Sequence, residues 1–388
     1  MTRRSEDTRR RIKSRVARAA VTAAHLTLLP LLTANAALGQ LPGPSLILLD
    51  TLILQEDAEH YVSAPVSVLQ GRDGSYLISD AFANAILQFD SDGRFVRAFG
   101  GPGQGPGEFV GVAPAMRVGG LVGAVDMGGM EIEVFDYQSG EAVGSIGLSP
   151  GMRITSMTEV GDSVWIAGMD RDTWMSVGTV TATELPSLAR TGSQESLRLD
   201  RIAIPSPYQT NPIMFGALGT AFLDVGESDI VVGFSGTPYL LLSRTGEPID
   251  TLHLQPRLRR GAPAEEDVRS PTEAMDPLLF ANEISVLGPL SRDANGNIIV
   301  VHTDLRVERT AMRPQVSDVR IHVSSLSPDG THQCADTEIP TASSGHPRVA
   351  LEGSLLLVVD QIPTARGEVS TVLRRFEVDP LTCDGEVR

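Results

Sequence analysis

The stretch that decides the fold is residues 65–100, PVSVLQGRDGSYLISDAFANAILQFDSDGRFVRAFG. Apolar segments of strand length alternate in it with the turn dipeptides Asp73-Gly74 and Asp92-Gly93. Gly, Asn and Asp tolerate the positive φ that tight hairpins require, so these dipeptides indicate reversals of the chain. The stretch therefore predicts four antiparallel strands joined by short turns.

Four later segments are apolar without interruption, which indicates strands that are buried on both faces. Parallel sheets covered by helices contain such strands, but helical periodicity is nearly absent from this chain. A radial stack of antiparallel sheets, each covered by its two neighbours, also contains them, and that fold is the β-propeller. The four segments are Val164–Ala167, Ile230–Val232, Ile298–Val301 and Leu355–Val359.

The order of segments in residues 65–100 returns over residues 114–146. The loop Gly103-Gln104-Gly105-Pro106-Gly107-Glu108-Phe109 lies between the two copies. Over residues 65–146 the chain resembles the NHL-repeat family of six-bladed propellers, in which a Gly-Pro-Gly-Glu-Phe loop links blades and apolar strands end in Asp. The spacing from Phe109 to Pro114 is longer than the usual loop of that family.

Four weaker copies follow, so we expect residues 45–388 to form one all-β domain, a six-bladed β-propeller of four-stranded antiparallel blades. These copies begin near Ile154, Leu218, Leu290 and Val349. Two insertions, Ser196–Gly216 and Pro256–Leu287, fall between blades, where propellers carry variable binding loops. The apolar segment Leu46–Leu54 precedes the first copy, and we expect it to close the ring beside Thr371–Val378 in the sixth blade.

Residues 1–39 have the pattern of a secretory signal peptide. Eight basic side chains in the first 18 residues precede the apolar run Ala19–Leu32 and the A-x-A site Ala34-Asn35-Ala36. The run is short for a bilayer span, so we expect no stable membrane span after signal removal, with a retained anchor as the alternative. Arg9-Arg10-Arg11 favours the twin-arginine route as strongly as the ordinary one. The expected location is periplasmic or extracellular.

The charge of the chain excludes one class of partner. Its 388 residues include 48 acidic and 32 basic side chains, for a net charge of −16. Eight of the basic residues lie in the signal segment, so the remaining body is more acidic still. Nucleic acid is therefore not expected as a partner, because phosphate binding needs a positive surface. Lys13 is the only lysine, which excludes a Schiff base or a phosphate-loop lysine from the body.

Five aspartates fall at one place in the repeat, the predicted end of the second strand. Each is expected to cap the following turn by accepting backbone N–H bonds. The sharper alternative is an acidic ring that holds a basic partner or a hard cation such as Ca²⁺, although the cofactor remains unknown. His302 shares a strand face with Asp304, and His322 lies in the same copy, but no zinc-binding motif accompanies them. The candidate binding residues are Asp80, Asp126, Asp170, Asp304, Asp360 and His302.

Cys334 and Cys383 are the only cysteines and fall in neighbouring predicted blades. An oxidising compartment favours a bridge between them, while two unpaired thiols remain the alternative.

The sequence predicts binding more readily than catalysis. It has no Gly-x-Ser-x-Gly motif and no evident Cys–His pair, so no catalytic residue is assigned. The leading hypothesis is a non-catalytic binding module that recognises a protein, peptide or glycan through interblade loops. Six-bladed relatives include calcium-dependent lactonases and zinc-dependent amidating lyases, so the alternative is a metal-dependent hydrolase or lyase with its site at the central channel. The residues match neither ligand pattern, and the sequence does not define the oligomeric state.

Overall fold

The fold is described from a computed structural model. It describes residues 42–57, 59–149, 152–169, 176–181, 184–191, 220–244, 246–254, 283–309, 314–341, 347–364, 369–385 and 387. The predicted signal segment, Asp170, the first insertion and most of the second lie outside these residues.

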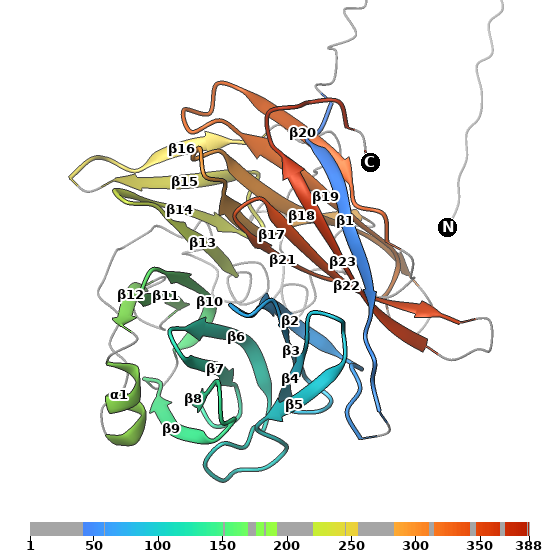
Figure 1. The fold of residues 1–388 in the computed structure, drawn as a ribbon. Helices are drawn as coiled ribbons and strands as arrows, with labels where there is room; N and C mark the ends of the chain where they lie inside the picture. The colour runs from blue at the N-terminus through green and yellow to red at the C-terminus, as the bar shows by residue number, and fades with distance from the viewer. Residues whose placement is uncertain are drawn as a thin grey trace, which may run out of the picture. The chain divides into compact units, whose positions relative to one another are not determined.

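The described strands form six antiparallel sheets, each built mainly from consecutive strands, so each sheet is one propeller blade (Figure 1). Five blades have four strands, and blade 3 has three described strands followed by the short helix α1 (Leu185–Thr191). Blades 1 and 2 contain β2 (Pro65–Gln70), β3 (Tyr76–Asp80), β4 (Ala85–Phe89), β5 (Phe95–Phe99), β6 (Val112–Val118), β7 (Leu121–Asp126), β8 (Glu131–Asp136) and β9 (Ala142–Gly147). Blades 3 and 4 contain β10 (Arg153–Val160), β11 (Ser163–Met169), β12 (Ser176–Thr181), β13 (Ala221–Val225), β14 (Asp229–Phe234), β15 (Tyr239–Arg244) and β16 (Asp250–His253). Blades 5 and 6 contain β17 (Glu283–Arg292), β18 (Ile298–Arg309), β19 (Pro314–Leu326), β20 (Gln333–Glu338), β21 (Arg348–Glu352), β22 (Leu355–Pro363), β23 (Val369–Asp379) and β1 (Ser45–Ile53).

The first strand of each blade lies innermost, around the axis of the ring (Figure 1). Strands β2, β6, β10, β13, β17 and β21 contact one another in that order, and β21 contacts β2. The next strands outward are buried between neighbouring blades, and every residue of β3 and β7 is buried. The uninterrupted apolar segments therefore have the double burial that the sequence predicts, and the six-bladed propeller is confirmed.

The N-terminal strand β1 closes the ring as the outermost strand of blade 6. It pairs with β23 in antiparallel register, from Ser45 opposite Asp379 to Ile53 opposite Val372, which confirms the predicted closure. Beside a bulge in β1, Asp50 accepts two hydrogen bonds from the Arg375 guanidinium, the one from Nε at 2.7 Å. Such a bidentate pair fixes register as well as adding energy.

Four of the five predicted turn dipeptides join neighbouring strands. Their glycines have φ between 69° and 82°, in the left-handed region that favours glycine. The fifth, Asp384-Gly385, follows β23 and joins no strands, so its prediction as a hairpin was wrong. No helix among the described residues is both long and apolar enough to cross a bilayer.

Three predicted boundaries in blades 5 and 6 were also wrong. Strand β17 begins at Glu283 rather than Leu290, because the ladder continues past a bulge between Leu287 and Leu290. Glu283–Leu287 therefore belong to the blade and not to the second insertion. Strands β18 and β22 continue past Asp304 and Asp360 to Arg309 and Pro363, so these two aspartates do not end their strands.

Candidate functional site

Asp80 and Asp126 cap turns at the end where the inner strands begin. Asp80 accepts backbone N–H bonds from Ser63 and Ala64 at 2.7 Å and from Phe82 and Ala83 at 2.9 and 2.8 Å. Asp126 accepts bonds of 2.9–3.1 Å from Val110, Gly111, Gly128 and Gly129. Both side chains are buried. Each carboxylate ties the loop before the inner strand to the turn after the second strand, and its binding role stays a prediction.

Asp304 and Asp360 have side-chain partners, and Asp360 also accepts a backbone N–H bond of 2.9 Å from the next residue. Asp360 accepts a hydrogen bond of 2.6 Å from Arg374 Nη2 and lines a cavity of about 430 Å³ between blades 6 and 1. Asp304 accepts a hydrogen bond from Ser285 Oγ and lies beside His322. Asp170 lies outside the described residues. Among the described residues no three of the predicted aspartates come within 4.8 Å of one another, so they do not form the ring that one shared Ca²⁺ would need.

A cavity of about 510 Å³ lies at the opposite end of the inner strands, where they turn into the second strands. All six blades line this cavity, which we call the turn-end cavity. None of its described lining residues is aromatic. Each blade contributes one charged side chain, namely Arg72, Arg117, Glu159, Asp224, Arg292 and Glu352.

Ion pairs between blades cross the turn-end cavity. Arg117 Nε donates to Glu159 Oε2 at 2.8 Å, and Arg117 Nη2 lies 3.7 Å from Glu352 Oε2. Arg72 pairs with the other oxygen of Glu159. Arg292 Nε lies 3.5 Å from Asp224 Oδ2. Arg292 Nη1 also donates to Asp229 Oδ1 at 2.6 Å, outside the cavity lining. The three arginines and three carboxylates that line the cavity are therefore equal in number, and their ion pairs join different blades.

Burial sets the electrostatics of the turn-end cavity. Burial raises the pKa of Glu352. Two weaker effects lower it, namely the hydrogen bond that the Gln70 backbone N–H donates to Glu352 Oε1 and the positive charge of Arg117. Burial also raises the pKa of Asp224, against the nearby Arg292 charge. In such partly desolvated surroundings a charged ligand group interacts more strongly with its partner than it would in water.

The sequence analysis missed these six charged residues, although a signal was present. In every copy at least one charged side chain lies shortly before the glycine of the first turn. The pairs are Arg72 with Gly74, Arg117 with Gly119, Glu159 with Gly161, Asp224 with Gly226, Arg292 with Gly296 and Glu352 with Gly353. Because inner strands converge on the axis of a propeller, this repeated charge predicts a charged channel end.

Blade 5 holds a buried polar cluster around the predicted His302. His302 and His322 lie opposite each other on β18 and β19, with ring centroids 5.2 Å apart and ring planes at 17°. His322 Nδ1 lies 3.4 Å from Asp304 Oδ2, and His302 Nε2 lies 3.2 Å from Asp336 Oδ1. Burial and then the neighbouring His302 lower the pKa of His322. The structure therefore brings His302 and Asp304 together and adds His322 and Asp336.

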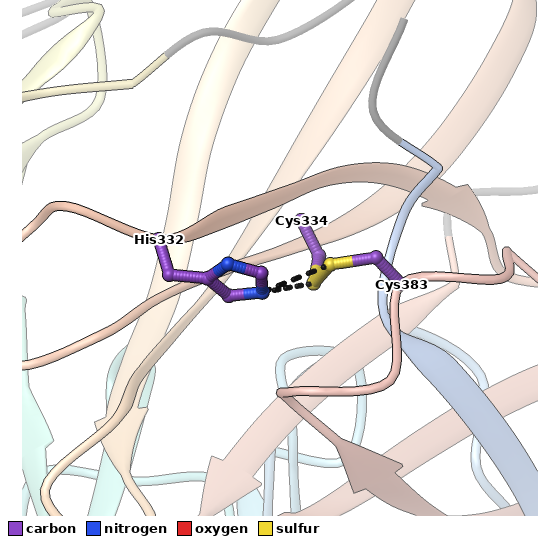
Figure 2. A group of neighbouring side chains, drawn as sticks. All are labelled: His332, Cys334 and Cys383. Carbon is purple, nitrogen blue, oxygen red and sulfur yellow. Dashed lines mark hydrogen bonds between the residues drawn. A yellow bond between two sulfur atoms is a disulfide. The ribbon is translucent and has the colours of Figure 1, made fainter.

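The two cysteines lie beside a histidine (Figure 2). Cys334 on β20 and Cys383 after β23 form a disulfide with Cα atoms 5.2 Å apart, and His332 Nε2 lies 3.3 Å from Cys383 Sγ. The bridge joins blade 5 to the segment that follows β23, where Ser45 N donates to Thr382 O at 3.0 Å. Sulfurs bonded to each other are not thiolate ligands, so this group is a covalent tie rather than a metal site.

Comparison with known proteins agrees with the fold. A family model described as 6-bladed beta-propeller, DUF5128, matches residues 54–143. No curated protein matches the chain. The NHL-repeat assignment stays a prediction.

Solved structures match most of the chain at low identity. A member of the DUF4221 family from Bacteroides vulgatus is 12% identical with a TM-score of 0.55, over 87% of this chain and 99% of that one. A candidate exported protein from Bacteroides fragilis is 10% identical with a TM-score of 0.53, over 86% and 95%. A streptogramin B lyase is 12% identical with a TM-score of 0.45, over 84% and 97%. At such identities the likeness to the first two structures shows the fold alone, and none of the three assigns an activity.

Proposed function

We propose that this protein is an exported, non-catalytic binding protein whose ligand is a short peptide with free termini, held in the turn-end cavity. The observation that carries the proposal is the convergence of three arginines and three carboxylates, one from each blade, on a single cavity. Its volume of about 510 Å³ suits a small ligand.

The balance of charge in the cavity favours a ligand that carries both signs. A ligand in the cavity competes with the ion pairs of Arg117 and Arg292. An anion alone would leave the displaced carboxylates without partners, and a cation alone would leave the arginines without partners. Both outcomes are costly at a partly buried site. The ammonium and carboxylate of a free peptide replace both kinds of partner.

The other ligand classes and the catalytic alternative have less support. Glycan sites use aromatic rings as stacking surfaces, and none of the described lining residues is aromatic. A folded protein is too large for the cavity. A metal-dependent hydrolase or lyase needs carboxylates that are free to bind the ion, whereas Glu159, Asp224 and Glu352 face arginines.

Export remains part of the proposal. The signal pattern of residues 1–39 supports it, and so does the Cys334–Cys383 bridge, because disulfides persist in oxidising compartments. The mature chain is expected to begin near Ala37 or Gln40. Sequencing the N-terminus of protein from the cell envelope tests this, and full-length protein in the cytosol would contradict it.

The binding proposal is tested with dipeptides and tripeptides, in free form and in N-acetylated, C-amidated form, by calorimetry. We expect the free forms to bind at least about tenfold more tightly than the capped forms, a difference of about 1.4 kcal/mol. Binding of both forms with equal affinity, or of neither, contradicts the proposal.

Two arginine variants locate the binding site. Arg72 is 52% exposed and its partner Glu159 retains Arg117, so Arg72→Gln is expected to fold and to weaken peptide binding by at least about tenfold. Arg94→Gln is the matched control, because Arg94 lies on the same blade, is 58% exposed, pairs with Asp92 and does not line the cavity. Equal losses in the two variants would place the ligand elsewhere.

A further inference from the structure

Three side chains in blade 5 meet the geometric needs of a transition-metal site. His302 and Asp304 lie two residues apart on β18, and His322 lies opposite His302 on β19. One ligand atom from each lies within 4.8 Å of the other two. The 3.4 Å from His322 Nδ1 to Asp304 Oδ2 equals the spacing of about 3.4 Å between neighbouring ligands of tetrahedral zinc with bonds of about 2.0–2.1 Å.

The two histidines carry buried nitrogens without hydrogen bonds. His302 and His322 are 1% and 2% exposed. Within the described part of the chain, His302 Nε2 and His322 Nδ1 make no aligned hydrogen bond, although each lies within 3.2–3.4 Å of a carboxylate oxygen. A buried polar atom without an aligned hydrogen bond is less stable than a fully bonded one, so these nitrogens carry a free-energy cost. A bound metal ion would use their lone pairs and offset that cost.

Neighbouring polar groups hold this cluster in place. Ser285 Oγ donates to Asp304 Oδ1. Asp336 Oδ1 lies 3.2 Å from His302 Nε2 and accepts a hydrogen bond of 3.2 Å from Ser324 Oγ. Asp336 has φ of 64°, a conformation uncommon for residues other than glycine. Because its carboxylate faces His302 Nε2, the nitrogen that would bind the ion, Asp336 is placed to act as a further ligand of the same ion.

The cluster lies on the face of blade 5 that packs against blade 4. Ile298 and Val300 share the alternation of His302 along β18, and they pack with Val231 of blade 4. The Asp304 side chain is 20% exposed, whereas those of His302 and His322 are 2% and 3% exposed. The cluster therefore opens to solvent on the Asp304 side, where a fourth coordination position would face water.

We propose that His302, His322 and Asp304 bind a divalent transition-metal ion, with Zn²⁺ as the best match. Two imidazoles and a carboxylate suit zinc-type ions, whereas Ca²⁺ and Mg²⁺ prefer oxygen ligands. None of the three residues lines the turn-end cavity. The site is therefore independent of the proposed peptide site, and either proposal can fail without the other.

The test is a calorimetric titration of Zn²⁺ into the mature protein after removal of metal with a chelator. No reductant is added, so that the Cys334–Cys383 disulfide stays intact. We expect one Zn²⁺ per chain, and visible absorption typical of tetrahedral coordination when Co²⁺ replaces zinc. Asp304→Asn and His322→Gln should each weaken Zn²⁺ binding by at least about tenfold, the lower limit known even for outer residues of metal sites.

Controls separate loss of a ligand from loss of the fold. Asp304→Asn changes a partly exposed group, so it is expected to fold even where His322→Gln does not, and circular dichroism of each metal-free variant verifies this. His60→Gln should bind zinc like the parent, because His60 and Asp57 form an exposed pair with Nδ1 3.1 Å from Oδ1. The proposal is overturned if the parent binds no zinc, if folded Asp304→Asn binds it as tightly as the parent, or if His60→Gln loses as much affinity.

Discussion

Asp126 in blade 2 and Asp304 in blade 5 occupy the same place in the repeat but have different surroundings. Strand β7 ends at Asp126, so free N–H groups of the adjoining loops converge on its carboxylate. Strand β18 continues past Asp304, pairing with β17 as far as Arg306 and with β19 as far as Arg309. The carboxylate of Asp304 therefore contacts Ser285 and His322 instead of a turn. One repeat position caps a turn where the strand ends, and where the strand continues its carboxylate faces side chains, which is the basis of the proposed metal site.

The largest predicted effect concerns the contrast between blade 2, built from one continuous segment, and blade 6, which borrows β1. Deleting Ser45–Ile53 removes the fully buried Leu46 and leaves Arg375 without Asp50. We expect aggregation or a loss of at least about 5 kcal/mol in unfolding free energy. Thermal melts measure it, with Ile53→Ala as control because Ile53 is 62% exposed. A deletion variant that melts like the parent would show that β1 does not close the ring.

The next effect concerns the covalent tie in the C-terminal blades, which the N-terminal blades lack. The cysteines are 49 residues apart, so loop entropy predicts that Cys334→Ser with Cys383→Ser costs about 4 kcal/mol. Urea unfolding of the parent and the double variant measures the difference. Two reactive thiols in denatured, unreduced mature protein would contradict the bridge.

A buried carboxylate in blade 2, Glu133, is expected to make the stability of the fold depend on pH. Burial raises the pKa of Glu133 to about 7. The Gly107 N–H donates a hydrogen bond of 3.0 Å to this carboxylate and lowers its pKa, but burial is the larger effect. Between pH 4.5, its ordinary pKa, and pH 7 the folded protein keeps a proton that the unfolded chain has lost, so stability falls as pH rises. Glu133→Gln should abolish this decline of about 3 kcal/mol. Urea unfolding at pH 4.5 and pH 8 measures it, and parallel pH profiles of variant and parent would contradict it.

The smallest effect tests the opening comparison itself. Asp126→Asn removes one of the two oxygens that accept backbone bonds, so we expect a loss of about 2 kcal/mol in unfolding free energy. Asp304→Asn in metal-free protein should cost less than about 1 kcal/mol, because the side chain is partly exposed and loses no backbone bond. Urea unfolding compares the two variants. Equal losses would mean that Asp304 is a cap like Asp126.

The fold was predictable because its signals are local. An apolar run such as Leu355–Val359 and a turn such as Asp73-Gly74 need no distant contact to be recognised. The closing strand Leu46–Leu54 followed from a general need, since a ring must be locked where its ends meet. The expected strand end at Asp304 failed because the pairing of β18 with β19, which a short window does not show, extends the strand.

The charged channel end was missed because it depends on the whole ring. Glu159 next to a glycine turn has the pattern of an ordinary exposed hairpin, and only closure of six blades brings it to Arg117 and Arg72. His302 and Asp304 were recognised as sharing a face from their spacing alone. The partner His322 required the register of β18 and β19, which sequence spacing does not give.

The most direct test of the central claim is amide hydrogen exchange of the mature protein with and without the free-terminus tripeptide that binds most tightly. A ligand in the turn-end cavity should slow exchange in the turns at Gly161 and Gly353, which line it, and leave Ser63 and Ala64 at the opposite end of the inner strands unchanged. Protection confined to Ser63 and Ala64, with no change at Gly161 and Gly353, would contradict the claim.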